Sequence, residues 1–218
     1  MDTTSNALSR VLHLLAYRPE TQEKLRQEFL EAQDQHGLDI PHDELMALPF
    51  LDAICRETLR LYPPAPVLAR GALKDAILPL SAPIKGLDGR EMHEIAIAKD
   101  TVIFFSIMNI NTDPVLWGPD AQEWKPERWL APLPEALVEA RIPGVYSNLL
   151  TFGGGTRSCI GFKLSQMEMK VLLSVLISQF RFSPAKGEIF WEMGPITVPA
   201  LKDNPGKAIL PLTVELLA

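Results

Sequence analysis

Apolar residues recur every three or four positions in several stretches of the chain, and this spacing gathers them on one face of an α-helix. The pattern predicts four longer helices, at residues 4–18, 19–36, 49–62 and 161–180. Pro19 and Pro49 stand where two of these helices begin, and Gly37 and Pro63 stand just after two of them end. The run from Val171 to Ile177 is the most apolar part of the sequence and predicts a buried helix.

Strand-like patterns occupy shorter stretches. We expect strands at residues 75–80, 94–98 and 102–109, with an Asp-Gly turn signal before the second of them. The tail, residues 189–217, is also strand-like, and "KDNPGK" within it predicts a hairpin turn. These strands are too short and scattered to build a large sheet.

Proline is unusually frequent. There are 19 prolines in 218 residues, against about 5% in ordinary proteins, and they concentrate between Pro63 and Pro143. Residues 112–150 therefore predict a long coil, with one short helix near residues 134–140. The whole pattern predicts a mainly α-helical fold with small peripheral β-sheets, and not a parallel α/β sheet.

The composition is that of a soluble globular protein, 47% hydrophobic and 22% charged. A net charge of −6 gives no reason to expect nucleic acid as a partner. No window reaches the run of about 18 apolar residues that a membrane span needs. Two cysteines, Cys55 and Cys159, are too few for a disulfide framework and favour a reducing compartment.

One charged pair lies on an apolar helix face. Glu57 and Arg60 stand three residues apart, which alone favours an exposed salt bridge of little energetic value. Glu57, however, lies one turn from both Ile54 and Leu61. A charge pair that faces a core needs a further partner, and we expect Arg128 of the proline-rich coil to supply it.

The stretch "FGGGTRSCIG", residues 152–161, places Cys159 between a run of glycines and the start of the last predicted helix. The helix start and the nearby charge of Arg157 both favour a thiolate at this position. Gly155, Gly161 and their glycine neighbours remove side chains on both sides of the cysteine. A large, flat group could therefore approach the sulfur closely.

Several other roles for this stretch must be compared. A phosphate loop would require the GxxxxGK[ST] motif, which is absent, and a buried structural cysteine is the ordinary alternative. Zinc would require three more ligands at short spacing, and none is present. A cysteine nucleophile assisted by one of the four histidines stays open. A lone thiolate beside Phe152, with an arginine available for a carboxylate, suits a haem iron better.

The chain resembles the cytochrome P450 family in three ordered motifs. "FGGGTRSCIG" matches all five fixed positions of the family's haem-binding signature, phenylalanine–x–x–glycine–x–arginine–x–cysteine–x–glycine. "ETLR" matches its glutamate–x–x–arginine motif, and "PERW" is similar to its proline–glutamate–arginine segment. The phrase "DTTSNALSRVLHLLA" looks most like fungal microsomal members. The resemblance implies the C-terminal portion of the cytochrome P450 fold.

The resemblance also implies roles for single residues. Cys159 resembles the thiolate ligand of the iron of haem b (iron protoporphyrin IX). Arg157 and, by position alone, Arg70 resemble the arginines that pair with the haem propionates. The haem-binding signature further includes Phe152, Gly155 and Gly161. Glu57, Arg60 and Arg128 resemble a structural triad that serves folding and haem retention.

At the start of the chain, "DTT" reads on sequence alone as a helix-capping acid followed by hydroxyls. The family places an acid–alcohol pair in a long helix that crosses over the haem. The resemblance therefore makes Asp2 and Thr3 candidates for a proton relay during oxygen activation.

The resemblance implies a monooxygenase that inserts one atom of dioxygen into a small hydrophobic substrate, with electrons from an NADPH-dependent flavoprotein reductase. The apolar segments 64–70 and 194–199 fit such a substrate. The family suggests the endoplasmic reticulum membrane, facing the cytosol, through an N-terminal anchor that this sequence lacks.

The resemblance covers only the C-terminal half of the family's length. We therefore expect residues 1–218 to form a single incomplete haem-binding domain. Its parts are a helical segment (1–62), a segment of strands, coil and cysteine loop (63–160), and a long helix with terminal strands (161–218). The alternative is a truncated, non-catalytic fragment that binds haem weakly or not at all.

Overall fold

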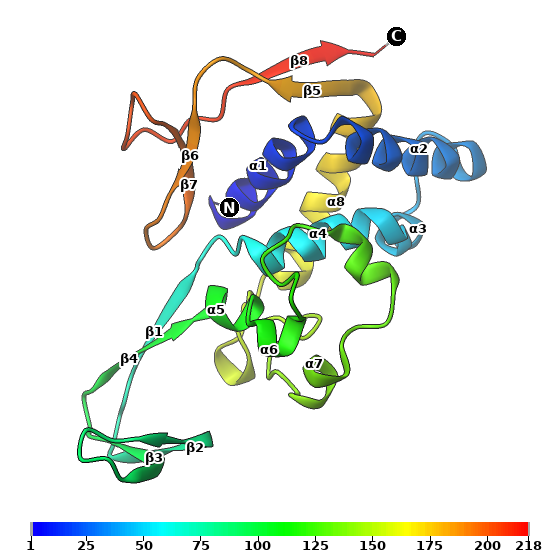
Figure 1. Ribbon diagram of the computed structural model, residues 1–218. Helices are drawn as coiled ribbons and strands as arrows, with labels where there is room; N and C mark the ends of the chain where they lie inside the picture. The colour runs from blue at the N-terminus through cyan, green and yellow to red at the C-terminus, as the bar shows by residue number, and fades with distance from the viewer. Residues whose placement is uncertain (1, 218) are drawn as a thin grey trace. The chain divides into compact units, whose positions relative to one another are not determined.

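The structure is a computed structural model that describes residues 2–217. The chain divides into two compact units (Figure 1). The larger unit contains the residues up to Pro66 and those from Ile107 onwards, and the smaller unit is Val67–Ser106. Every helix in the described part of the chain belongs to the larger unit.

Four long helices and several short ones build the larger unit. The helices are α1 (Asp2–Ala16), α2 (Pro19–His36), α3 (His42–Ala47), α4 (Pro49–Leu61), α5 (Ile107–Asn111), α6 (Pro114–Trp117), α7 (Glu135–Glu139) and α8 (Phe162–Gln179). Two short 3-10 helices, η1 (Pro126–Leu130) and η2 (Gly155–Arg157), lie in the chain between α6 and α8. The long helices predicted from apolar spacing are confirmed, with ends that differ by one or two residues.

Local chemistry explains the ends of these helices. Pro19 and Pro49 occupy the first turns of α2 and α4, where a missing N–H costs no hydrogen bond. Gly37 ends α2 at a φ of 90°, and its N–H donates to Gln33 O. Such a positive φ suits glycine, because glycine has no Cβ to clash with the backbone.

Two antiparallel pairs of strands complete the larger unit. β5 (Phe180–Pro184) pairs with β8 (Leu212–Leu216), and β6 (Ile189–Glu192) pairs with β7 (Val198–Leu201). β5 follows α8 directly, and the N–H of Phe180 donates to Leu176 O of that helix. The two ladders are separate two-stranded sheets.

The smaller unit consists of two antiparallel ladders. β1 (Val67–Gly71) pairs with β4 (Val102–Ser106), and β2 (Ala76–Lys85) pairs with β3 (Glu91–Ile97). The β2–β3 hairpin closes through a hydrogen bond from Gly86 N to Arg90 O at 2.8 Å. Its strands are largely exposed on both faces.

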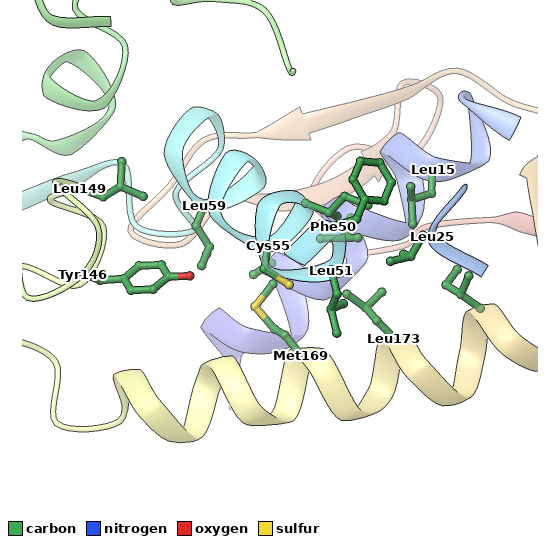
Figure 2. Packing of buried hydrophobic residues seen from close by; sticks show 14 of the residues in the cluster. Leu15, Leu25, Phe50, Leu51, Cys55, Leu59, Tyr146, Leu149, Met169 and Leu173 are labelled. Carbon is green, nitrogen blue, oxygen red and sulfur yellow. The ribbon is translucent and has the colours of Figure 1, made fainter. Parts of the chain in front are cut away.

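The hydrophobic core of the larger unit gathers around α4. Leu51, Ile54 and Cys55 of this helix are buried, and Figure 2 shows Leu51 and Cys55 pointing toward Leu173 and Met169 of α8. Helices α1 and α2 pack against the same two helices. Burying one such side chain contributes about 1.5–3 kcal/mol, so α4 supplies a large share of the folding free energy.

The fold class predicted from the sequence, mainly helical with small sheets, is confirmed. Two predicted strand features are wrong. The strand expected at 102–109 ends at Ser106, and α5 begins at the next residue. The helical conformation is favoured there because it allows Ile107 and Asn111 to be buried in the core. The hairpin turn expected at "KDNPGK" does not join paired strands. The turn between β6 and β7 lies at residues 193–197, and β8 pairs with β5.

The helix α8 also differs from its prediction. The run from Val171 to Ile177 was expected to be buried, but Val171, Leu172 and Val175 are 42%, 39% and 48% exposed. Only Leu173 and Ile177 of this run are buried, because a helix presents one face to a one-sided core. In the coil predicted at 112–150, the short helix α7 is confirmed near its expected place. The short helices α6 and η1 in the same segment were not predicted.

Candidate functional site

The loop that carries Cys159 is held by its own backbone. Cys159 N donates to Phe152 O at 2.8 Å, and Ser158 N donates to Gly155 O at 3.1 Å. Gly153 and Gly155 have φ values of 67° and 68°, in the left-handed region that glycine adopts without strain. The result is a compact turn that ends at the cysteine.

The backbone of residues 143–144 packs closely against the cysteine loop. A Cβ at Gly154 would lie 1.8 Å from Pro143 O, and a Cβ at Gly144 would lie 1.7 Å from Leu149 O. No side chain fits at either position without moving the backbone. Two glycines therefore allow segment 143–144 to support the cysteine loop directly.

The two cysteines of the chain have opposite environments. Cys55 is buried in the core, and this burial raises the pKa of its thiol to about 12. Cys159 is exposed, just before α8. A Cβ built on Gly161 would lie 4.0 Å from Cys159 Sγ, so the glycine leaves space beside the sulfur. Cys159 is thus the cysteine that is available to a ligand.

The environment of Cys159 fits an iron whose other ligands are not protein side chains. Across residues 2–217, no group of three or more His, Cys, Asp and Glu side chains could hold a metal ion. This arrangement does not suit zinc, which needs three or four protein ligands. A single protein thiolate would be enough to hold haem, because haem brings its other iron ligands with it.

The other residues of the signature surround the cysteine. Phe152 is partly buried, and its ring lies 5.5 Å from the Tyr146 ring and 6.1 Å from the Phe162 ring. Arg157, on η2, is exposed, and within the described residues it forms no ion pair. The Arg157 guanidinium is therefore free to pair with an anionic group.

The structure brings Glu57 and Arg60 together in the core. Both side chains are 0% exposed, and Arg60 Nε and Nη2 donate to the two carboxylate oxygens of Glu57 at 2.8 Å each. The remaining Arg60 donors reach three backbone carbonyls, of Asn111 at 3.0 Å, Ala121 at 2.6 Å and Glu123 at 3.0 Å. All five N–H groups of this buried guanidinium thus have acceptors.

The Glu57 carboxylate is equally well satisfied. Besides Arg60, it accepts hydrogen bonds from Lys125 N at 2.9 Å and from Trp129 Nε1 at 2.9 Å. Arg128 Nε lies 3.4 Å from the same carboxylate, the longest of these contacts. A buried ion pair is costly unless its remaining hydrogen bonds are made, and here they are.

Arg128 does reach Glu57, as expected from the sequence, but its shorter contacts go elsewhere. Its Nη1 donates to Asp120 Oδ1 at 2.8 Å, and its Nη2 donates to Asp120 O at 2.9 Å. The hydrogen bonds from Arg128 and from Lys125 lower the pKa of the Asp120 carboxyl to about 2. The contacts of Asp120 and Trp129 were not predicted, because Asp120 belongs to no motif and the "PERW" segment gives no partner for its tryptophan.

Asn111 connects this network to the cysteine loop. Its carbonyl accepts from Arg60, while its side-chain amide donates to Thr151 Oγ1 at 2.8 Å and accepts from Leu150 N at 2.9 Å. The Thr151 hydroxyl in turn donates to Leu59 O of α4 at 2.7 Å. Thr151 directly precedes Phe152, so the buried pair and the cysteine loop share one hydrogen-bonded frame.

Three predicted site residues form no hydrogen bond with this frame within residues 2–217. Asp2 and Thr3 form the first turn of α1, and both side chains are exposed. The neighbouring Thr4 is buried and donates to Ser165 Oγ of α8 at 3.1 Å, which anchors this end of α1. Arg70 lies in β1 of the smaller unit, exposed, with a hydrogen bond to Ala69 O at 2.9 Å.

Parts of the two segments expected to line a substrate pocket meet within the larger unit. Thr197 N donates to Pro64 O at 2.7 Å, and Pro64, Pro66 and Thr197 all line one cavity of about 160 Å³. Asn6 and Arg10 of α1 also line this cavity, which the sequence did not predict.

The sequence profile described as "Cytochrome P450" matches residues 1–193 of the chain. The chain is 53% identical over 220 residues to "Ganoderic acid synthetase CYP5150L8" of Ganoderma lucidum. It is 52% identical over 215 residues to "Cytochrome P450 monooxygenase 91" of Postia placenta. These alignments cover 100% and 99% of this chain but 40% and 39% of the relatives. The chain therefore spans well under half the length of these curated relatives.

A solved structure shows the same arrangement of elements. The crystal structure of a cytochrome P450, CYP102L1, superposes on this chain with a TM-score of 0.71 and 28% sequence identity. The match covers 99% of this chain and 42% of the other. The fold described above is thus similar to a portion of that structure.

Proposed function

The chain belongs to the cytochrome P450 family, and we propose that it forms the haem-binding part of a monooxygenase acting on a hydrophobic organic substrate. The observation that carries this proposal is the exposed Cys159 at the end of a glycine-fixed turn, directly before α8. When bound, haem b supplies an iron that activates dioxygen, and a cysteine thiolate pushes electron density toward it.

Each residue of the signature has a separate task in this proposal. Cys159 would supply the thiolate ligand, Gly161 leaves room beside its sulfur, and the carbonyl of Phe152 holds the cysteine by accepting a hydrogen bond from Cys159 N. Arg157 pairs with one haem propionate, because it is an exposed cation two residues from the ligand. Arg70 is the proposed second propionate partner, and this assignment rests on its position in the sequence.

In this proposal, a structural role falls to Glu57, Arg60 and Arg128, and none of them contacts the substrate. Their side chains are 0%, 0% and 7% exposed, so they cannot reach a bound ligand. Through Asn111 and Thr151 they set the position of the cysteine loop. We therefore assign to them the retention of haem in a fixed geometry.

Asp2 and Thr3 are the proposed proton relay. An acid and an alcohol on the same exposed helical turn can exchange a proton through water and deliver it to a site that faces them. This assignment depends on the match of "DTT" to the acid–alcohol pair of the family.

The proposed partners follow from family membership. Electrons come from NADPH through a flavoprotein reductase, and dioxygen and a small hydrophobic molecule are the substrates. The proposed location is the cytosolic side of the endoplasmic reticulum membrane. No helix within residues 2–217 is long and apolar enough to cross a bilayer.

Haem titration of the purified chain tests the central assignment. We expect the wild type and the control Cys55→Ala to bind haem, and the reduced, carbon-monoxide-bound form to show the absorbance of a thiolate-ligated iron. Cys159→Ala should lose this absorbance, since it removes the only exposed thiol. A thiolate-type spectrum in Cys159→Ala would show that another residue is the ligand. Failure of all three proteins to bind haem would support the alternative of a non-catalytic chain.

A further inference from the structure

The cavity of about 160 Å³ in the larger unit has an apolar wall and one cationic side chain. Leu61, Pro63, Met108 and Met193 supply the apolar wall, and Arg10 projects from α1. Pockets that hold a whole small molecule are usually about 300 Å³ or larger. This cavity is therefore the size of a subsite for one end of a ligand.

Two aromatic rings hold the Arg10 guanidinium in place. Its Cζ lies 3.5 Å from the centroid of the Trp191 ring and 4.2 Å from the centroid of the Tyr62 ring. Contacts with two aromatic faces stabilise the cation and restrict its movement. Arg10 also lines the cavity, so its guanidinium is available to an acceptor bound there.

Arg10 has no anionic partner in the described part of the chain. Among residues 2–217, no carboxylate forms an ion pair with it, and no acceptor forms a hydrogen bond with it. Burial consequently lowers the pKa of Arg10 to about 9, with a small opposing effect from Tyr62. The two buried arginines differ from the partly buried Arg10: Arg60 pairs with Glu57, and Arg26 donates to Ile177 O at 2.9 Å and Phe180 O at 3.0 Å.

His13 adds no second charge to this cavity. Its Nδ1 accepts a hydrogen bond from Trp191 Nε1 at 2.8 Å, which requires Nδ1 to be unprotonated. Burial and the charges of Arg10 and Arg18 lower the pKa of His13. The neutral ring also stacks on Trp191 at 5.8 Å and 20°, so that it holds the tryptophan against Arg10.

We propose that this cavity is a subsite for the carboxylate of a hydrophobic carboxylic acid, with Arg10 as the residue that selects it. A planar carboxylate matches the two parallel N–H donors of a guanidinium edge. A single cation matches a monoanion, whereas a phosphate group would call for more positive charge. The apolar wall then takes the first carbons of the acid. This substrate class rests on the proposed function, since it describes what the monooxygenase site admits.

Calorimetric titration of the haem-free chain with decanoate and with 1-decanol tests the proposal. The two ligands share a chain of the same length and differ in the charged end. Only the carboxylate can form a charge-assisted hydrogen bond with Arg10, so decanoate should bind at least about tenfold more tightly. Equal affinities, or no binding of decanoate, would overturn the proposal without any variant being made.

Two matched variants test whether Arg10 is the residue that causes the preference for decanoate over 1-decanol. Arg10→Gln should bring the affinities for decanoate and 1-decanol to within about twofold of each other. Arg18→Gln should keep the preference, because Arg18 makes a similar contact with an aromatic ring, 4.9 Å from Trp124, outside the cavity. A preference that survives in Arg10→Gln contradicts the assignment. Because no haem is present, these results are independent of whether Cys159 binds iron.

Discussion

Asp120 accepts a hydrogen bond from Arg128 at 2.8 Å and another from Lys125 at 3.1 Å. These two donors, the first above all, lower the pKa of its carboxyl from 3.8 to about 2. A carboxyl with a lowered pKa in the folded state stabilises the fold above its unfolded pKa. That stabilisation is lost as the pH falls through the folded value.

We therefore expect Asp120→Asn to lower the free energy of unfolding by about 1 kcal/mol at pH 7. The difference from the wild type should shrink as the pH falls from 5 toward 2, since the wild-type carboxyl then becomes neutral as well. Urea denaturation at a series of pH values measures this difference. Asp34→Asn, at an exposed position of α2, is the control, and a difference in Asp120→Asn that does not change with pH would contradict the assignment.

At the scale of single residues, sequence reasoning succeeded where a residue type and a fixed spacing carry chemistry. Glu57 and Arg60 are three apart on an apolar helix face, and the structure places both in the core. Trp129 and Asn111 could not be predicted, because their partners lie far away in the sequence, and their contacts exist only once the coil has folded back onto α4. Asp120 lies only eight residues from Arg128, but no motif pairs the two residues.

The helix α4 is the element on which the buried network depends. We expect Glu57→Ala to lower the free energy of unfolding by about 3–5 kcal/mol, because it leaves the buried Arg60 charge without its carboxylate. The same variant leaves Lys125 N and Trp129 Nε1 without their acceptor. Chemical denaturation followed by circular dichroism measures the loss.

Glu31→Ala is the matched control for this change, since Glu31 lies on an exposed position of α2. It should alter the free energy of unfolding by less than about 0.5 kcal/mol. A loss of similar size in both variants would show that the Glu57 network contributes no more than an exposed carboxylate does.

At the scale of elements, helices with clear apolar spacing and proline starts were predictable, and α1, α2, α4 and α8 were found. The strand pairings were not. β5 pairs with β8 across 27 intervening residues, 185–211, and no local signal specifies such a partner. Residues 107–109 look strand-like in sequence, but packing in the core makes them helical.

At the scale of the whole molecule, α8 leaves several apolar side chains exposed. Leu164, Val171, Leu172 and Val175 lie on one side of the helix around Glu168, and each is between 39% and 61% exposed. Exposed apolar side chains grouped in this way promote association between molecules. We expect the double variant Leu172→Lys, Val175→Lys to reduce self-association of the chain, as measured by analytical ultracentrifugation over a range of concentrations.

Leu87→Lys is the control for this prediction. Leu87 is fully exposed in the turn of the β2–β3 hairpin of the smaller unit and is not part of α8. The added charge is of the same kind, so it should leave the self-association unchanged. If Leu87→Lys reduces association as much as the double variant does, net charge and not the α8 face governs it.

The backbone carbonyls of Ala121 and Glu123 are bound by Arg60, a side chain that is fully buried beneath them. The segment from Asp113 to Pro134 has only the short helices α6 and η1 and contains Arg128, whose bond to Trp129 is a cleavage site for trypsin. A protease must draw such a segment out in extended form, which here means removing Arg60 from its acceptors and opening the core. This coil should therefore be cut only as fast as the larger unit unfolds globally, despite its irregular backbone.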